Sequence, residues 1–243
     1  MAAESRRTVS GNKGAICYSL EQKDVKNLNL RIHRDGSIYV SASPMVPADK
    51  IDDFVLSKQN FIYTQKAKFD EITQFAPKPK KYVSGETFQI LGKGIRLKVK
   101  QAEKEEVYSD GVYLYLCVKE PLDFARKQKL VTRYINSRCR DVFCEIMAEI
   151  YPTFQKYGVE YPALRIRTMD TRWGSCLKQK GIITLNKRLI EAPRNCIEYV
   201  VMHEYCHFIH PDHSKLFYGF LAMLMPDWKE RKTVLDKYAD YWL

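Results

Sequence analysis

The pattern of hydrophobic and polar positions predicts a strand-rich first part of the chain. Residues 28–40 contain two short β-rich runs on either side of His33-Arg34-Asp35-Gly36, a sequence typical of a hairpin turn. Residues 48–69 have helical spacing and predict one helix. Glycine-containing turns then separate three further expected strands, at 87–91, 95–99 and 112–118. Residues 28–118 are therefore predicted to be mostly antiparallel β-structure with one helix.

The period of the pattern changes after Pro121. Apolar residues recur at helical spacing from Leu130 to Ile150 and predict one long amphipathic helix. Two strands are expected after it, at 163–168 and 181–189, with a turn around Trp173-Gly174-Ser175 between them. A helix over 193–211 and a last helical region over 217–242 follow. This order of elements indicates an α+β fold rather than a doubly wound parallel sheet.

Three regions follow from these changes along the chain. Residues 1–13 are polar and predict a flexible tail. Residues 14–120 are expected to form a β-rich region that binds substrate or has an accessory role, and residues 121–243 a second domain. Pro77 and Pro79, which lie among lysines, indicate a linker. No internal repeat is visible in the sequence.

The composition is that of an ordinary globular protein, with 45% hydrophobic and 28% charged residues in 243 positions. No signal peptide is visible at the N-terminus, and no stretch approaches the roughly 20 apolar residues of a membrane span. The seven cysteines are scattered, with no C-x-x-C, which argues against a disulfide framework. A soluble cytoplasmic protein is therefore expected, of unknown oligomeric state.

The formal net charge of +11 lies mostly in the first 100 residues, where 18 Lys and Arg face 10 Asp and Glu. Such a basic half could approach nucleic acid or an acidic protein surface. A solvated surface without a partner is the more ordinary interpretation of such a charge. The interleaved aromatic and basic residues of a known nucleic-acid module do not accompany the charge along the chain.

Four of the five histidines lie within residues 203–213. His203 and His207 are four residues apart on a predicted helix, so both rings project from one face about one turn apart. Two imidazoles at this spacing can bind one tetrahedral Zn²⁺ at about 2.0–2.1 Å. Glu204 can reach a water beside the ion and serve as general base without ligating the metal. The segment therefore predicts a zinc-dependent peptidase that hydrolyses peptide or protein substrates.

The third ligand is predicted to be His213. His210 would lie about 10 Å along the helix axis from the first ligand, so its ring would overshoot the ion. Pro211 ends the helix and lets the chain return toward the metal, and the spacing equals that of H-E-x-x-H-x-x-G-x-x-H. His210 then occupies the turn position, where histidine tolerates a positive φ. Glu230 on the next helix is the alternative ligand, and a buried Cys206 thiol is not needed.

The chain resembles the YgjP-like metallopeptidase family, which is related to the SprT and WLM zinc peptidases. The resemblance rests on R-W-G-S-C at 172–176, L-N-x-R-L at 185–189, Y-V-V-x-H-E-x-x-H at 199–207 and H-P-x-H-S-x-x-F at 210–217. It extends in weaker form back to about Leu28. The resemblance implies a minimal zincin-like domain over 121–243, with His203, His207 and His213 as zinc ligands and Glu204 as catalytic base.

Residues outside the metal centre are less determined by the sequence. The strand 181–189 could hold an extended substrate by main-chain pairing if it lies at a sheet edge. Trp173, Ser175 and Asn186 are candidate substrate-binding residues, although Trp173 could equally fill the core and Ser175 turn the hairpin. Tyr218 or Tyr238 could stabilise the oxyanion.

Two other functions are consistent with the sequence. One is a DNA-associated protease or binding factor that uses the basic N-terminal half. The other is a structural zinc module without catalysis. Glu204 argues against it, because a structural site has no need of this glutamate. Such a site would also normally close with a fourth protein ligand.

Overall fold

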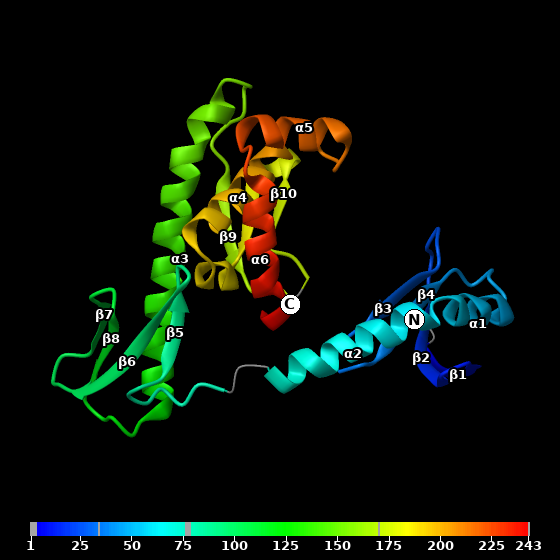
Figure 1. Cartoon of the computed structure of the whole chain (residues 1–243), viewed down its shortest axis with the longest axis horizontal. Helices are drawn as coiled ribbons and strands as arrows, with labels where there is room; N and C mark the ends of the chain where they lie inside the picture. Colours follow the sequence, from blue (N-terminus) through cyan, green and yellow to red (C-terminus); the bar gives the residue numbers. More distant parts are fainter. Residues whose placement is uncertain (1–3, 34, 76–78, 170, 243) are drawn as a thin grey trace. The chain divides into compact units, whose positions relative to one another are not determined.

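The computed structural model describes residues 4–33, 35–75, 79–169 and 171–242, with side chains for all of these except 4, 68–75 and 239–242. Arg34 of the predicted turn and Pro77 of the predicted linker lie outside the described residues. The chain divides into two compact units, Met1–Ala76 (unit 1) and Pro77–Leu243 (unit 2), whose elements are labelled in Figure 1. Helices and small sheets in both units confirm the predicted α+β class. Among the described helices, none has the length and apolar character needed to cross a membrane.

Unit 1 is a four-stranded sheet in the order β1-β2-β4-β3, packed on two helices. Its two hairpins are antiparallel, and the central pair β2–β4 is parallel. Buried side chains alternate along β2 and pack with Ile51 and Val55 of the first helix. The elements are β1 (Glu4–Gly11), β2 (Gly14–Gln22), β3 (Asn29–Ile32), β4 (Ile38–Ala42), α1 (Ala48–Ser57) and α2 (Gln59–Phe75).

Two predictions for unit 1 are wrong. Residues 4–11 of the expected flexible tail form β1, because their main chain pairs with β2 and Arg7 forms an ion pair with Asp52 on α1. The single helix predicted over 48–69 is two helices, α1 and α2, which meet at Lys58. At this residue ψ is 5°, outside the helical value, and no proline or glycine in the sequence signals the break.

Unit 2 begins with a second four-stranded sheet, in the order β5-β6-β8-β7. Its two hairpins are also antiparallel and its central pair β6–β8 is also parallel. The two sheets therefore share one topology, although the sequence shows no repeat. Both are mostly antiparallel, as predicted, and each contains one parallel pair that the sequence does not indicate. The strands are β5 (Thr87–Ile90), β6 (Lys93–Gln101), β7 (Glu106–Ser109) and β8 (Tyr113–Val118).

The long helix α3 (Phe124–Gln155) connects this sheet to the rest of unit 2. Near its start Arg126 forms an ion pair with Glu105, just before β7. Near its end Phe154 stacks on Tyr205 of α4, with ring centroids 4.9 Å apart. Figure 1 shows α3 running from the sheet to the helices that follow. The predicted domain boundary at 120/121 therefore falls inside unit 2, between a sheet and a helix that share one core.

The remaining elements of unit 2 are a small sheet, the helix α4 and two further α-helices, α5 and α6. The sheet has the order β10-β11-β9, with β10 antiparallel and β9 parallel to the central β11. The elements are β9 (Ala163–Arg167), β10 (Gly174–Leu177), β11 (Ile182–Asn186), α4 (Arg194–Cys206), α5 (Lys215–Leu224) and α6 (Trp228–Trp242), with short 3₁₀ helices η1 (Lys178–Lys180) and η2 (Lys187–Glu191). The predicted strand 181–189 is thus central and does not lie at the sheet edge that pairing with a substrate requires.

Candidate metal centre

Helix α4 carries His203, and His207 is the capping residue directly after its last turn. The helix begins after Pro193, which suits a helix start because the missing N–H has no partner there in any case. Most of its residues are buried, so α4 is the central helix of unit 2. The helix ends at Cys206, whose carbonyl oxygen accepts hydrogen bonds from the N–H groups of Ile209 and His210. Pro211 prevents continuation, and the chain turns back.

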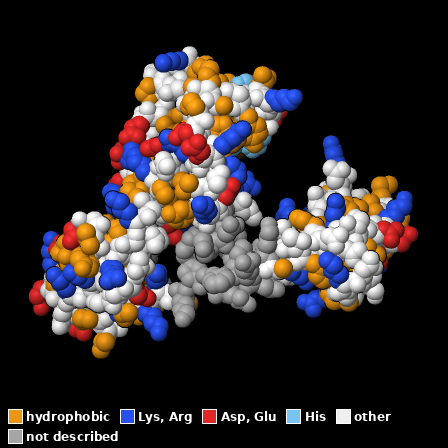
Figure 2. All heavy atoms as spheres, in the orientation of Figure 1, with side chains coloured by type: hydrophobic (Ala, Val, Ile, Leu, Met, Phe, Trp, Pro, Cys, Tyr) orange, Lys and Arg blue, Asp and Glu red, His pale blue; other side chains and the backbone are white. Residues whose placement is uncertain are grey.

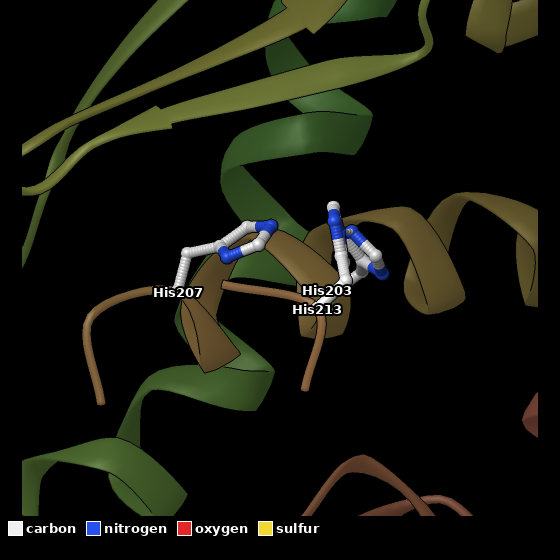
Figure 3. Close-up of side chains that lie close together, drawn as sticks. All are labelled: His203, His207 and His213. Atoms are coloured by element: carbon white, nitrogen blue, oxygen red, sulfur yellow. Dashed lines mark hydrogen bonds between the residues drawn. The ribbon is translucent and has the colours of Figure 1, made fainter. Parts of the chain in front are cut away.

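This turn brings His213 to His203 and His207. The three ring centroids lie 4.7 to 4.9 Å apart, and one ligand atom from each ring lies within 4.8 Å of the others. Figure 3 shows the three rings gathered at one place. The Nε2 atoms of His203 and His213 are 2.9 Å apart. Tetrahedral zinc bonds of about 2.0–2.1 Å set neighbouring nitrogens roughly 3.3 Å apart, so these donors suit one such ion.

The surrounding residues orient the rings. The His207 Nδ1 lies 3.2 Å from the carbonyl oxygen of His210, which leaves the His207 Nε2 available to a metal. The buried ring of Phe217 lies 4.7 to 4.9 Å from all three imidazole centroids and forms the floor of the cluster. Ser214 caps α5 by accepting from the N–H of Phe217, and this fixes the loop that carries His213.

Burial keeps His203 and His207 in the neutral form that a metal binds. Burial, together with the neighbouring His207 and His213, lowers the pKa of His203 to about 3. Burial also lowers the pKa of His207. Since a metal binds the neutral imidazole, these rings are in the binding form at neutral pH without losing a proton first.

Glu204 is a buried carboxyl group beside the histidines, with only 5% of its surface exposed. Its Oε2 and the Nδ1 of His203 are the buried side-chain polar atoms without a hydrogen-bond partner among the described residues. Burial raises the pKa of Glu204 to about 8, and Arg172 opposes this rise. A carboxyl group with a pKa near neutrality suits proton transfer at physiological pH.

Gly174 on β10 makes room for this carboxyl group. A Cβ at position 174 would lie 2.5 Å from Oε1 of Glu204 and 2.9 Å from its Cγ and Cδ. Real Cβ atoms do not approach other atoms this closely, so a larger residue would displace Glu204. The glycine of the R-W-G-S-C segment is therefore required by the position of the Glu204 carboxyl group.

Asn186, a predicted substrate-binding residue, has a different place. It is fully buried, and its Nδ2 donates to the carbonyl oxygens of Met169 and Arg172 at 2.8 and 3.0 Å. Its backbone N–H donates to the carbonyl oxygen of Trp173 at 2.8 Å. The side chain therefore fastens the segment before β10 and does not line the cleft, because its amide is fully used within the protein.

The metal centre opens into a cleft of about 520 Å³. Trp173 and Ser175 line this cleft together with the three histidines and Glu204, as expected for substrate-binding positions. Strand β10 is an edge strand, paired with β11 on one side. The free edge for substrate pairing therefore belongs to β10 and not to β11.

Sequence reasoning missed several residues of the cleft. Tyr199 lines it and lies four residues before His203, so the helical spacing on α4 could have identified it. Arg172 lies next to the predicted Trp173. Lys232 and Asp236 come from α6, and no local pattern in the sequence associates that helix with the histidines.

Other candidates lie outside the histidine cluster. His210 contributes its backbone oxygen and packs its ring against Phe220, and its φ is not positive, contrary to expectation. Glu230 is exposed on α6 and does not line the cleft. Cys206 is fully buried. Tyr218 stacks on His213 at 6.0 Å, whereas Tyr238 packs against the core.

Comparison with known protein families places the chain among metallopeptidases. A family model described as YgjP-like, metallopeptidase domain, matches residues 26–238. Among solved structures, the chain is similar to the metallopeptidase zymogen jannalysin of Methanocaldococcus jannaschii, with 19% identity and a TM-score of 0.33 over 41% of this chain and 95% of that chain. No curated protein matches the chain.

Proposed function

Because the chain belongs to the YgjP-like metallopeptidase family, we propose that it is a zinc-dependent peptidase with His203, His207 and His213 as ligands. The observation that carries the proposal is the convergence of these three imidazoles beside the buried carboxyl group of Glu204. Three protein nitrogens and an open fourth position are typical of catalytic zinc, whereas structural zinc takes four protein ligands. Among the described residues, no fourth His, Cys, Asp or Glu joins the group.

Glu204 is the proposed general base. A zinc ion held by the three histidines would supply Lewis acidity, which acidifies water and polarises a peptide carbonyl. Glu204 then takes a proton from the attacking water and delivers it to the leaving amine. Its unpartnered Oε2 is free for this role, and its raised pKa favours both taking and returning the proton.

The edge of β10 is the proposed binding place for the substrate backbone. An extended peptide can pair with Gly174–Leu177 as an added strand, which holds its carbonyl groups in a fixed register beside the histidines. Trp173 and Ser175 would then contact substrate side chains. Peptides and unfolded protein segments are the expected substrates, because only an extended chain can add to a strand.

The direct test combines metal analysis with peptidase assays on Glu204→Gln. We expect full zinc content and a loss of turnover of about 10²–10⁴-fold, the usual contribution of a general base. Glu230→Gln is the matched control, since it removes an exposed glutamate that was the alternative ligand. It should retain both zinc and activity, and normal turnover in Glu204→Gln would refute the mechanism.

A second pair of variants tests the ligand set. His213→Ala should lose zinc, because only two imidazoles remain. His210→Ala should keep it, because His210 acts through its backbone oxygen. Loss of zinc in His210→Ala with retention in His213→Ala would overturn the assignment of the third ligand.

A further inference from the structure

The face of the β5–β8 sheet that points away from α3 carries basic and aromatic side chains in adjacent rows. Leu97, Leu114 and Leu116 point to the core, so the alternate positions of each strand point outward. We call this surface the outer face. Its basic and aromatic members are Arg96, Lys98 and Lys100 of β6, Tyr113 and Tyr115 of β8, and Tyr108 of β7.

Strand pairing brings these residues into contact. Arg96 lies opposite Tyr113, and Lys98 opposite Tyr115. The Lys98 Nζ is 3.2 Å from the centroid of the Tyr113 ring, and the Lys100 Nζ is 4.8 Å from that of Tyr115. Tyr108 stacks on Tyr115, with centroids 4.9 Å apart, and is 44% exposed. Figure 2 shows basic and hydrophobic side chains mixed over the part of unit 2 that holds this sheet.

The outer face has an excess of positive charge. Glu106 is its one acidic strand position among the described residues, and it forms an ion pair with Lys104. Asp110 at the adjoining turn accepts hydrogen bonds from the O–H of Tyr115 and from two backbone N–H groups. Residues 77–100 contain seven Lys and Arg against one Glu, whereas residues 1–76 contain 11 against 9. Most of the basic excess of the first 100 residues therefore lies in the β5–β6 hairpin and the segment before it, and less of it in unit 1. Residues 101–118, which hold β7 and β8, contain one Lys against four acidic residues, so the positive charge of the outer face comes from β6.

The fold itself does not require such a surface. The sheet of unit 1 has the same strand order and pairing, yet its corresponding face carries small polar residues such as Thr8, Ser19 and Ser41 where unit 2 has its rows of lysine and tyrosine. Arg6 and Arg31 also lie on that face, but Glu21 accompanies them, and Tyr39 is its exposed aromatic residue. Lysine and tyrosine pairs do stabilise a sheet. Three basic residues and three tyrosines on one of two sheets of equal topology nevertheless indicate a specific partner.

We propose that the outer face binds single-stranded nucleic acid. The ammonium and guanidinium groups of β6 would bind phosphate groups, and unpaired bases would stack on the tyrosine rings of β7 and β8. Flexible lysines that now cover the rings can move to phosphates, because their charged ends are at the surface. DNA and RNA share both features, so either should bind, without strong dependence on sequence. A duplex hides the faces of its bases and should bind more weakly.

Fluorescence anisotropy of the full chain with labelled oligothymidine and oligouridine tests this inference. Strands of about 20 nucleotides exceed the site sizes of known single-strand-binding folds. We expect binding that weakens as salt rises. For Lys98→Gln/Lys100→Gln, the slope of log affinity against log salt should fall by about 1.4, since each single-strand phosphate contact contributes about 0.7. The matched control is Lys129→Gln/Arg133→Gln on exposed positions of α3, which makes the same charge change and should leave the slope unaltered.

The tyrosines distinguish stacking from simple charge attraction. Tyr108→Ala should weaken binding about five-fold or more, whereas Tyr108→Phe, which keeps the ring, should bind as the unaltered chain does. Circular dichroism checks that each variant is folded. The inference is overturned if the unaltered chain shows no salt-dependent binding, if the α3 control loses affinity equally, if Tyr108→Ala binds normally, or if duplex binds as tightly as single strands. Because peptidase activity is not the readout, these results do not depend on the proposed zinc mechanism.

Discussion

The two four-stranded sheets have one topology but are followed by very different helices. In unit 1 the ten-residue α1 covers the sheet, and the chain then breaks into α2. In unit 2 the 32-residue α3 covers the sheet with its first turns and extends well beyond it. Its second half binds α4: the O–H of Tyr205 donates to the carbonyl oxygen of Met147, and Arg194 contacts Glu145 and Glu149.

Because of this difference in helix length, unit 1 has a self-contained core, whereas the core of unit 2 extends along α3 and supports further elements. We call the second arrangement a platform. The buried residues of unit 1 form one closed cluster between its sheet and its helices. The cluster of unit 2 is continuous from the β5–β8 sheet, along α3, to the residues under the metal centre. The same arrangement of strands can thus form a small unit with its own core. It can also support further elements, here those that carry the histidine cluster, when the helix that follows provides a second packing surface.

The largest expected effect concerns the proposed catalytic elements, which lie in unit 2. Gly174→Ala should lower kcat/KM by about 100-fold or more, because the new Cβ must displace the Glu204 carboxyl group and shifts of about 1 Å cost this much. Zinc content should be unchanged, since no histidine is touched. Gly219→Ala on α5, where a Cβ meets nothing within 4 Å, is the matched control and should keep full activity. Equal activity of the two variants would contradict the role of Gly174.

Much of the histidine cluster could be predicted from the sequence because its geometry is local. Helical spacing relates His203 to His207, and Pro211 with the following loop accounts for the return of His213. The contact of Gly174 with Glu204 could not be worked out from spacing along the chain, because it depends on β10 lying beside α4. Nothing in the intervening residues indicates this contact, and only the family resemblance implies a hairpin at Trp173 to Ser175 beside the helix of His203.

The organisation of the sheets was less predictable for the same reason. Hairpins such as β5–β6 are local and were expected, but the parallel pairs β2–β4 and β6–β8 join strands from different hairpins. The shared topology of the two sheets arises from these pairs, so no sequence repeat reveals it. The outer face was missed because its basic and aromatic rows come from different strands and meet only when the strands pair.

The second prediction compares matched core residues of the two units. Phe154→Ala should destabilise unit 2 by about 3–5 kcal/mol, because Phe154 is fully buried and stacks on Tyr205 of the active-site helix. Peptidase activity should fall at temperatures where the unaltered chain is stable. Thermal unfolding monitored together with zinc release measures both effects.

The matched variant in unit 1 is Ile51→Ala, which removes a fully buried side chain of α1. It should cost about 2–5 kcal/mol within unit 1 and leave the unfolding of unit 2 and zinc retention unchanged. Zinc release at the same lowered temperature in both variants would show that the two cores unfold as one, which would break the contrast between a closed unit and a platform.

The smallest expected effect concerns the ion pairs that join each sheet to its helix. In unit 1, Asp52 of α1 accepts hydrogen bonds from Arg7 of β1 and from the O–H of Tyr18, and in unit 2 the corresponding link joins Glu105 and Arg126. The hydrogen bond from Arg7 is the largest cause that lowers the pKa of Asp52 in the folded protein. A carboxyl group with a lowered pKa adds stability above its unfolded pKa of about 3.9, and this stability is lost as the pH falls through the folded value.

Asp52→Asn should therefore destabilise unit 1 by about 1 kcal/mol at neutral pH, a modest amount because both partners are partly exposed. The difference from the unaltered chain should shrink as the pH drops below about 4, where Asp52 becomes protonated in the unfolded and then in the folded chain. Denaturant unfolding of unit 1 across this range measures it, with unit 2 as internal reference. A difference that stays constant with pH would mean that the Asp52 contacts act through shape alone, and that charge does not hold β1 to its helix.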